Sequence, residues 1–273
     1  MKVNFSLETE IEIEIGMQHV QVPVRVNGKG PFSFTLDTGA SVTSISKRIA
    51  EQLGIETRDG SRIEATGVGG SIPVKYADVE IGIGALEFEK DEVYVMDFDA
   101  IFRGIGNHEG VFGFTTLNQC TLSLNYKTKS LKIRKGSSDS DLHWTPFKYI
   151  KDSHLVGVPV HINGKGPFDF VLDTGAGNTC ITPTLATQIE LDATPVQGIA
   201  RGLGGDVQLE LAAVDTLSIG ETTISNSQMV VIDLSKVSPK GDLIENGIIG
   251  YDFLSRFETV IDYPKKRFSF IDD

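Results

Sequence analysis

VRVNGKGPFSFTLDTGA, at residues 24–40, occurs a second time as VHINGKGPFDFVLDTGA at residues 160–176, and thirteen of the 17 positions are identical. The offset between the copies is 136 residues (160 − 24). Shorter matches follow at nearly the same offset: Gly67-Val-Gly-Gly70 with Gly202-Leu-Gly-Gly205, Val111-Phe-Gly113 with Ile248-Ile-Gly250, and Asn125-Tyr126 with Asp262-Tyr263. Two copies that keep this spacing through most of the chain indicate a duplicated domain, and the period is too long for a solenoid repeat.

The boundary between the copies is predicted in a short polar stretch. Residues 135–141 (KGSSDSD) are rich in Gly, Ser and Asp, a composition typical of linkers. We therefore expect an N-terminal lobe over residues 1–136, a linker over residues 137–141 and a C-terminal lobe over residues 142–273. Because the copies share one sequence pattern, the lobes are expected to be related by approximate two-fold symmetry.

Within each copy the sequence predicts mainly β-strands, and hence an all-β fold. Gly supplies 29 of the 273 residues, which indicates many tight turns. Apolar runs on both sides of Gly28-Lys-Gly30 predict a hairpin over residues 20–36, and the second copy predicts one over residues 154–172. Acidic residues alternate with Ile over residues 10–15, the pattern of a half-buried strand. Only short helices are predicted, over residues 46–53, 116–119, 183–191 and 251–256.

Composition and charge argue against several classes of partner. The net charge of −12 and the pI near 4.9 make nucleic acid and anionic membrane surfaces poor partners. No run of 18 apolar residues is present, and acidic residues stand near the N-terminus where a signal peptide needs an apolar stretch. The pattern favours a soluble protein in the cytoplasm.

The cysteines and histidines give no sign of a metal or another cofactor. Cys120 and Cys180 are too few for a disulfide framework; the sequence favours two buried thiols and leaves open a single disulfide between them. The five histidines show no metal-ligand spacing. We therefore expect neither a metal nor another cofactor.

The sequence feature that indicates a catalytic site is a repeated motif, Asp37-Thr38-Gly39 and Asp173-Thr174-Gly175, and each copy follows an apolar run. In two lobes related by a two-fold axis, equivalent loops meet at that axis. Two carboxyl groups brought together there share one proton, so that the ionised member can activate a water and the protonated member can protonate a carbonyl oxygen. The glycines, which lack a Cβ, permit close approach, and the threonines can form hydrogen bonds across the junction.

The chain resembles the aspartic peptidases of the retropepsin and pepsin type in these loops, in the later Val111-Phe-Gly113 and Ile248-Ile-Gly250, and in its glycine motifs. It is most similar to bacterial retropepsin-like aspartyl proteases, here with two copies in one chain. The resemblance implies two pseudo-symmetric, closed β-barrel-like lobes, an endopeptidase acting on peptide or protein substrates, and a monomer with one intramolecular site. It also implies that the glycine motifs are flaps over the substrate, formed by Gly67, Gly69, Gly70, Gly202, Gly204 and Gly205.

The two loops differ at the residue after Ala, which is Ser41 in the first and Gly177 in the second. In the family a hydroxyl near this position commonly bonds the outer oxygen of the aspartate. We therefore hypothesise that Ser41 favours the ionised form of Asp37 and leaves Asp173 as the more often protonated member. Two alternatives remain open: Asp-x-Gly is also ordinary turn chemistry, and the fold could serve a peptide-binding module without turnover.

Overall fold

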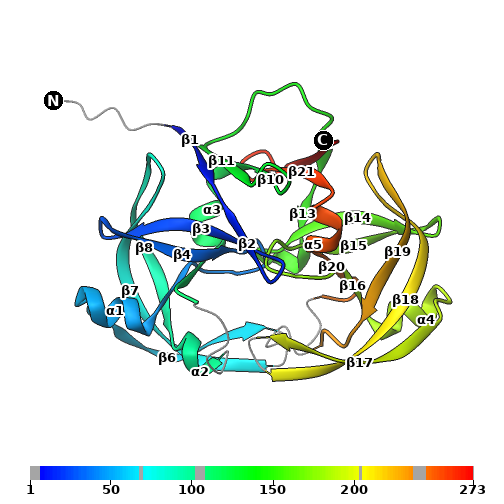
Figure 1. Ribbon diagram of the computed structural model, residues 1–273, viewed down its shortest axis with the longest axis horizontal. Coiled ribbons are helices and arrows are strands. Elements are labelled where there is room, and N and C mark those ends of the chain that lie inside the picture. Colours follow the sequence, from blue (N-terminus) through cyan, green and yellow to red (C-terminus); the bar gives the residue numbers. More distant parts are fainter. Residues whose placement is uncertain (1–6, 68–69, 102–107, 203–204, 236–243, 273) are drawn as a thin grey trace.

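Three β-sheets make up the computed structural model, which describes residues 7–67, 70–101, 108–202, 205–235 and 244–272. Figure 1 shows a lobe on each side of the molecule and a third sheet above and between them. Two sheets have eight strands each and belong to one lobe each, while the third has six strands drawn from both halves of the chain. This mostly β architecture agrees with the predicted all-β fold of two pseudo-symmetric lobes.

Each lobe contains a sheet that closes on itself. The strands of lobe one are β2 (Glu14–Gly16), β3 (His19–Val26), β4 (Lys29–Leu36), β5 (Ser44–Ser46), β6 (Arg58–Gly67), β7 (Gly70–Ile83), β8 (Leu86–Met96) and β9 (Gly110–Phe112). Their order is β2-β3-β4-β9-β5-β8-β7-β6, and an additional pairing of β3 with β7 closes six of them into a barrel.

Lobe two repeats this arrangement strand for strand. Its strands are β13 (Lys148–Tyr149), β14 (Val156–Ile162), β15 (Lys165–Leu172), β16 (Cys180–Ile181), β17 (Ala193–Gly202), β18 (Gly205–Ile219), β19 (Thr222–Val231) and β20 (Gly247–Ile249). Their order is β13-β14-β15-β20-β16-β19-β18-β17, and the additional pairing of β14 with β18 closes the second barrel. The sequence repeat is therefore a repeat of structure, as predicted.

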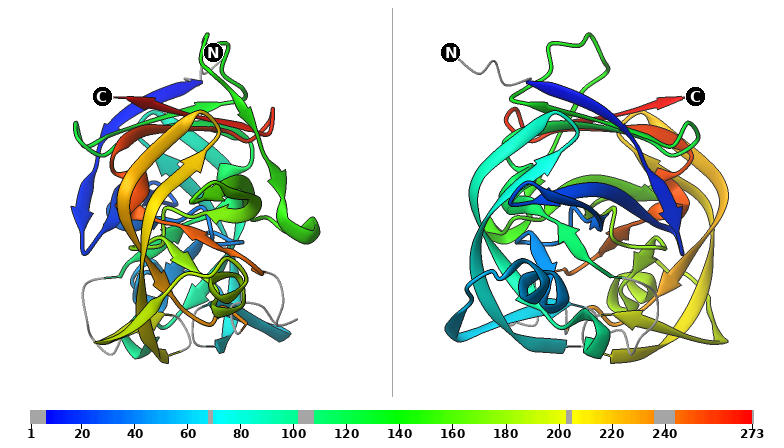
Figure 2. Two further views of the ribbon diagram at one scale, coloured as in Figure 1. Left: turned by 90° about the vertical axis from the view of Figure 1, so that its right-hand side faces the viewer. Right: turned by 60° about the vertical axis from the view of Figure 1, so that its left-hand side comes forward.

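The six-stranded sheet joins the two lobes. It consists of β1 (Glu8–Glu12), β10 (Cys120–Asn125), β11 (Ser130–Lys135), β12 (Thr145–Pro146), β21 (Phe257–Asp262) and β22 (Arg267–Asp272). Their order is β1-β11-β10-β21-β22-β12, so the equivalent strands β10 and β21 pair antiparallel at its centre. Both views of Figure 2 show this sheet covering one end of the molecule.

The single strand predicted over residues 10–15 is wrong. The chain instead forms β1 and β2, which belong to different sheets. Between them lies Ile13, which is fully buried and whose N–H donates to the carbonyl of Lys129 at 2.9 Å. The alternating pattern continues through the change of sheet because Ile11 and Ile15, on either side of it, are partly buried against the core.

The hairpin turns lie one residue earlier than predicted. Asn27 (φ 50°) and Gly28 (φ 70°) form the turn between β3 and β4, and Asn163 (φ 50°) and Gly164 (φ 75°) form its counterpart between β14 and β15. Positive φ at both residues is the type I′ turn that matches the twist of a hairpin, for which Asn-Gly is the favoured sequence. The sequence signal was therefore present in Asn27-Gly28 rather than in Gly28-Lys-Gly30.

The helices are short and lie at strand ends. They are α1 (Lys47–Leu53), α2 (Phe98–Ile101), α3 (Phe114–Leu117), α4 (Pro183–Gln188), α5 (Tyr251–Leu254) and the 3₁₀ turn η1 (Ile150–Asp152). The Ser46 hydroxyl caps α1 by accepting from the Ile49 N–H at 3.1 Å, and Gly54 ends it in the left-handed region. Helix α2 was not predicted, and α3 begins at Phe114 rather than at Thr116.

Both cysteines are buried and free, which confirms the thiols favoured by the sequence and answers the open question of a disulfide between them. Cys120 lies at the start of β10 and Cys180 at the start of β16, in different sheets. No helix among the described residues combines the length and the apolar character needed to cross a membrane. The described part of the chain also holds no cluster of three or more metal-binding side chains.

Candidate active site

The two Asp-Thr-Gly loops begin where a buried strand of each lobe ends. Asp37 follows β4, and its N–H donates to the carbonyl of Phe112 in β9 at 3.1 Å. Asp173 follows β15, and its N–H donates to the carbonyl of Ile249 in β20 at 3.0 Å. Because β9 and β20 run parallel to these strands, the apolar-apolar-Gly motifs fix the position at which each loop leaves its sheet.

The threonines hold the two loops together across the junction. The Thr38 hydroxyl donates to the Leu172 carbonyl at 2.8 Å and accepts from the Thr174 N–H at 3.0 Å. The Thr174 hydroxyl donates to the Leu36 carbonyl at 2.8 Å and accepts from the Thr38 N–H at 3.1 Å. Both threonines are buried, so these four bonds satisfy backbone groups that water cannot reach. The cross-junction bonding expected of the pair is present.

The carboxyl groups of Asp37 and Asp173 lie close enough for each to act on the pKa of the other. Gly39 and Gly175 pack directly against them: a Cβ at Gly39 would lie 2.6 Å from Oδ2 of Asp173, and a Cβ at Gly175 would lie 2.6 Å from Oδ1 of Asp37. No side chain fits at such distances. The close approach predicted for these glycines is thus required by the position of the opposite carboxyl group.

Burial raises the pKa of both aspartates. Oδ1 of Asp37 accepts from the N–H groups of Gly39 at 2.9 Å and Ala40 at 2.8 Å. Oδ1 of Asp173 accepts from the N–H of Gly175 at 2.8 Å, and the Gly39 N–H also acts on Asp173. The two groups differ in that the charge of Asp37 raises the pKa of Asp173. Asp37 is therefore the better site for the negative charge and Asp173 for the proton.

The hypothesis that Ser41 produces this asymmetry is wrong. Its side chain is exposed, and the hydrogen bonds of the described residues include none between its hydroxyl and Asp37. The donors to Asp37 are backbone amides of the same loop instead. The expected direction of the asymmetry remains: the Ala40 amide supports the charge on Asp37, and that charge raises the pKa of Asp173.

The glycine motifs lie at the tips of two long hairpins. Gly67 pairs with Gly70 at the end of the β6–β7 hairpin, and Gly202 pairs with Gly205 at the end of the β17–β18 hairpin. Gly69 and Gly204 lie outside the described residues. In Figure 1 both hairpins extend along the side of the molecule opposite the six-stranded sheet.

Two buried tyrosines near the carboxyl pair were not predicted to belong to the site. Tyr126 and Tyr263 are the repeat-equivalent residues that follow β10 and β21, and neither hydroxyl has a hydrogen-bond partner among the described residues. Burial raises the pKa of both, and the pKa of Tyr263 is raised further by the nearby aspartates. The paired motifs that contain them marked their positions, but nothing in the sequence indicated that Tyr126 lies near Asp173 and Tyr263 near both aspartates.

His154 was also missed, because the sequence suggested only a surface or structural role for it. Its ring nitrogen Nε2 lies 2.8 Å from the carbonyl oxygen of Gly39, so a side chain of lobe two contacts the aspartate loop of lobe one. The two residues are far apart in sequence, and no motif links them.

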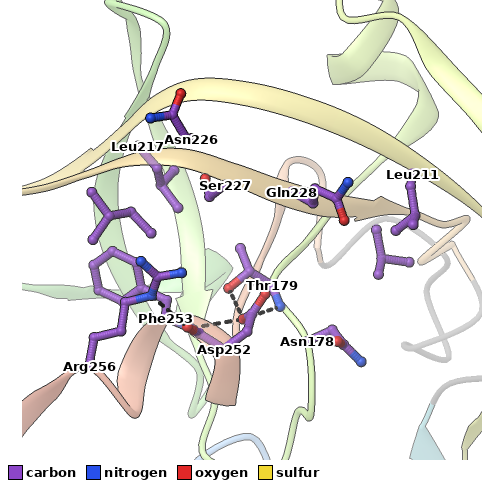
Figure 3. Close-up of a pocket in the computed structure, with 12 residues that line it drawn as sticks. Asn178, Thr179, Leu211, Leu217, Asn226, Ser227, Gln228, Asp252, Phe253 and Arg256 are labelled. Carbon is purple, nitrogen blue, oxygen red and sulfur yellow. Dashed lines mark hydrogen bonds between the residues drawn. The ribbon is translucent and has the colours of Figure 1, made fainter.

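A cavity of about 450 Å³ lies in lobe two beside Asn178 and Thr179, which follow the second aspartate loop (Figure 3). The residues that line it include neither aspartate of the pair. Oδ1 of Asp252 accepts from the N–H of Thr179 at 2.7 Å, from its hydroxyl at 2.6 Å and from the Phe253 N–H at 2.9 Å. The two bonds from Thr179 attach the loop to α5, so Asp252 has a structural role.

Comparisons with known proteins agree with this geometry. A family model described as "Aspartyl protease" matches residues 22–116 and again residues 158–253. Among solved structures the chain is similar to the aspartic proteinase from Irpex lacteus, with 15% identity, a TM-score of 0.58 and 97% of each chain covered. At this identity the likeness concerns the fold. No curated protein matches the sequence.

Proposed function

The chain belongs to the aspartyl protease family, and from this membership we propose that it is an endopeptidase whose catalytic residues are Asp37 and Asp173. The observation that carries the proposal is the meeting of two half-buried carboxyl groups, one from each copy of the repeat, each packed against the glycine of the opposite loop. Nothing in a merely structural turn requires two acidic side chains to be held against each other.

The proposed reaction uses the one proton that the pair holds, a known property of aspartic proteases rather than a result of this structure. Ionised Asp37 takes a proton from a water, whose oxygen attacks the peptide carbonyl carbon, while Asp173 gives its proton to the carbonyl oxygen. The resulting tetrahedral diol collapses when Asp37 gives its proton to the leaving nitrogen and Asp173 takes one back from a hydroxyl. The C–N bond breaks, and the pair returns to its starting state.

The substrate is proposed to be an extended peptide that lies between the carboxyl pair and the two hairpin tips. Such a peptide can bond to hairpin strands as an added β-strand does, and flaps in general admit a substrate and then cover it. The flap role of the glycines, Gly69 and Gly204 included, is part of this proposal. Since one chain supplies both aspartates, we propose a monomer that needs neither a metal nor another cofactor.

The test is hydrolysis of a peptide library and of a denatured protein across a range of pH. Asp37→Asn and Asp173→Asn should each abolish cleavage, whereas Asp215→Asn, at an exposed position in β18, should leave it unchanged. Full activity in both active-site variants would contradict the proposal. Binding of peptides without cleavage by the wild type would instead favour the peptide-binding module.

A further inference from the structure

His154 makes a contact between the lobes at the aspartate loop. It lies between η1 and β14, where the Ser153 hydroxyl accepts from the Leu155 N–H at 3.0 Å and so fixes the local chain. The ring is half-buried and packs on Phe114 of lobe one with the ring centroids 5.9 Å apart. Phe114 in turn donates its N–H to the Ala40 carbonyl at 2.9 Å. The imidazole is therefore held against the loop that carries Asp37.

The partner of His154 decides where its proton lies. The carbonyl oxygen of Gly39 can only accept, so Nε2 must carry a hydrogen. Burial lowers the pKa of His154, so the neutral imidazole, protonated at Nε2 alone, is the form above that pKa. The imidazolium below it also carries a hydrogen at Nε2. The donor is thus present in both protonation states.

The bond from His154 continues to the aspartate through one peptide unit. The Gly39 carbonyl and the Ala40 N–H are the two ends of the same planar group. Its carbonyl end accepts from His154 at 2.8 Å, and its N–H end donates to Oδ1 of Asp37 at 2.8 Å. A donor at the carbonyl end fixes the plane and polarises the N–H at the other end, which strengthens that second bond.

The second loop lacks this arrangement. The repeat places Gln18 at the position equivalent to His154 (154 − 136), and its Oε1 would lie 3.0 Å from a Cβ built at Gly177. Ala40 and its equivalent Ala176 each donate the N–H to the main-chain carbonyl of the aspartate in their loop, at 3.4 Å and 3.3 Å, and Ala40 donates to Oδ1 of Asp37 as well. The hydrogen bonds of the described residues include none from Ala176 to the Asp173 carboxyl group. A bond from this alanine amide to the carboxyl group of its own loop thus occurs, among the described residues, only in the loop that His154 contacts.

We propose that His154 is a positioning residue: its Nε2–H orients the Gly39–Ala40 peptide toward Asp37 and so makes Asp37 the member of the pair that carries the negative charge. The consequence for catalysis rests on the proposed function, whereas the effect on the charge of the pair does not. Other titratable groups also act on Asp37, namely Asp173, His19 and Tyr263. None of these three donates to the peptide unit that His154 holds.

The test is to titrate the aspartates directly, by carboxyl ¹³C chemical shifts of the full-length protein labelled at Asp, with Asp37→Asn and Asp173→Asn used for assignment. His154→Leu removes the donor, and we expect the lower apparent pKa of the pair to rise by about one pH unit. His154→Gln keeps an N–H donor and should return the titration toward that of the wild type. His143→Leu, at a side chain that is 94% exposed, is the matched control and should have no effect.

An unchanged titration in folded His154→Leu, or an equal shift in His154→Gln, would overturn the inference. A second measurement needs no variant: the histidine ¹⁵N spectrum of the wild type should show neutral His154 protonated at Nε2, and protonation at Nδ1 alone would also overturn it. Peptide cleavage is assayed in parallel. If His154→Leu shifts the titration as expected but the wild type cleaves no peptide, the endopeptidase proposal is refuted and the role of His154 stands. If the wild type cleaves peptides but His154→Leu leaves the titration unshifted, the role of His154 is refuted and the endopeptidase proposal stands.

Discussion

Thr38→Val should destabilise the protein strongly, although it changes no charge and almost no volume. The fully buried Thr38 hydroxyl satisfies two backbone groups of the other lobe, the Leu172 carbonyl at 2.8 Å and the Thr174 N–H at 3.0 Å. Valine leaves both groups buried without a partner, at about 1–3 kcal/mol each. We therefore expect the free energy of unfolding to fall by about 2–6 kcal/mol, measured as a lower urea midpoint with an unchanged slope.

Two further variants separate the hydrogen bonds from other effects of the substitution. Thr38→Ser keeps the hydroxyl and loses one methyl group, so it should cost only about 1 kcal/mol. Thr194→Val, at an exposed position of β17, should stay within about 0.5 kcal/mol of the wild type. If Thr38→Val cost no more than Thr38→Ser, the cross-lobe bonds would contribute nothing to stability and the reasoning would be refuted.

Three more outcomes follow from the site and its surroundings. Asp173→Asn should unfold at a higher temperature than the wild type at pH 7. Folding raises the pKa of the Asp173 carboxyl group, so the wild type loses stability as the pH rises from the unfolded pKa through the folded pKa. Thermal scans should show the difference in unfolding temperature disappear below about pH 4, where the carboxyl group is neutral in both the folded and the unfolded state. Gly39→Ala should lower peptide cleavage at least about a hundredfold, since its methyl group would displace the Asp173 carboxyl, whereas Gly16→Ala, with open space around it, should keep wild-type rates. Burial raises the pKa of Cys120 and that of Cys180 to about 12, so neither thiol should react with an alkylating reagent at pH 8 until the protein is unfolded, as mass spectrometry can show.

The sequence repeat predicted the features that symmetry alone determines. Equivalent loops meet at a two-fold axis, which is why the closeness of Asp37 and Asp173 and the bonds between Thr38 and Thr174 could be expected before any coordinates. The hairpins followed from local turn chemistry, with an error of one residue because the glycines drew attention away from Asn27. The domain boundaries in the polar linker stay a prediction.

Features that break the symmetry, or that depend on distant contacts, could not be predicted. His154 differs from its equivalent Gln18, and only the folded chain brings it to Gly39. Ser41 was assigned a role by resemblance, yet its side chain faces solvent. The six-stranded sheet was missed because each of its strands has an ordinary pattern, and strand pairing between lobes leaves no mark in periodicity.

The central β10–β21 pairing of the shared sheet has a consequence for how such a molecule can evolve. When two identical chains build a site, dilution separates them, and every substitution appears twice. Here a covalent link holds the partners at a fixed, high local concentration, so the two halves can change independently. One half can carry an imidazole, as at His154, while the other carries an amide, as at Gln18. A site that arose by duplication can thereby assign different protonation states to its two equivalent aspartates.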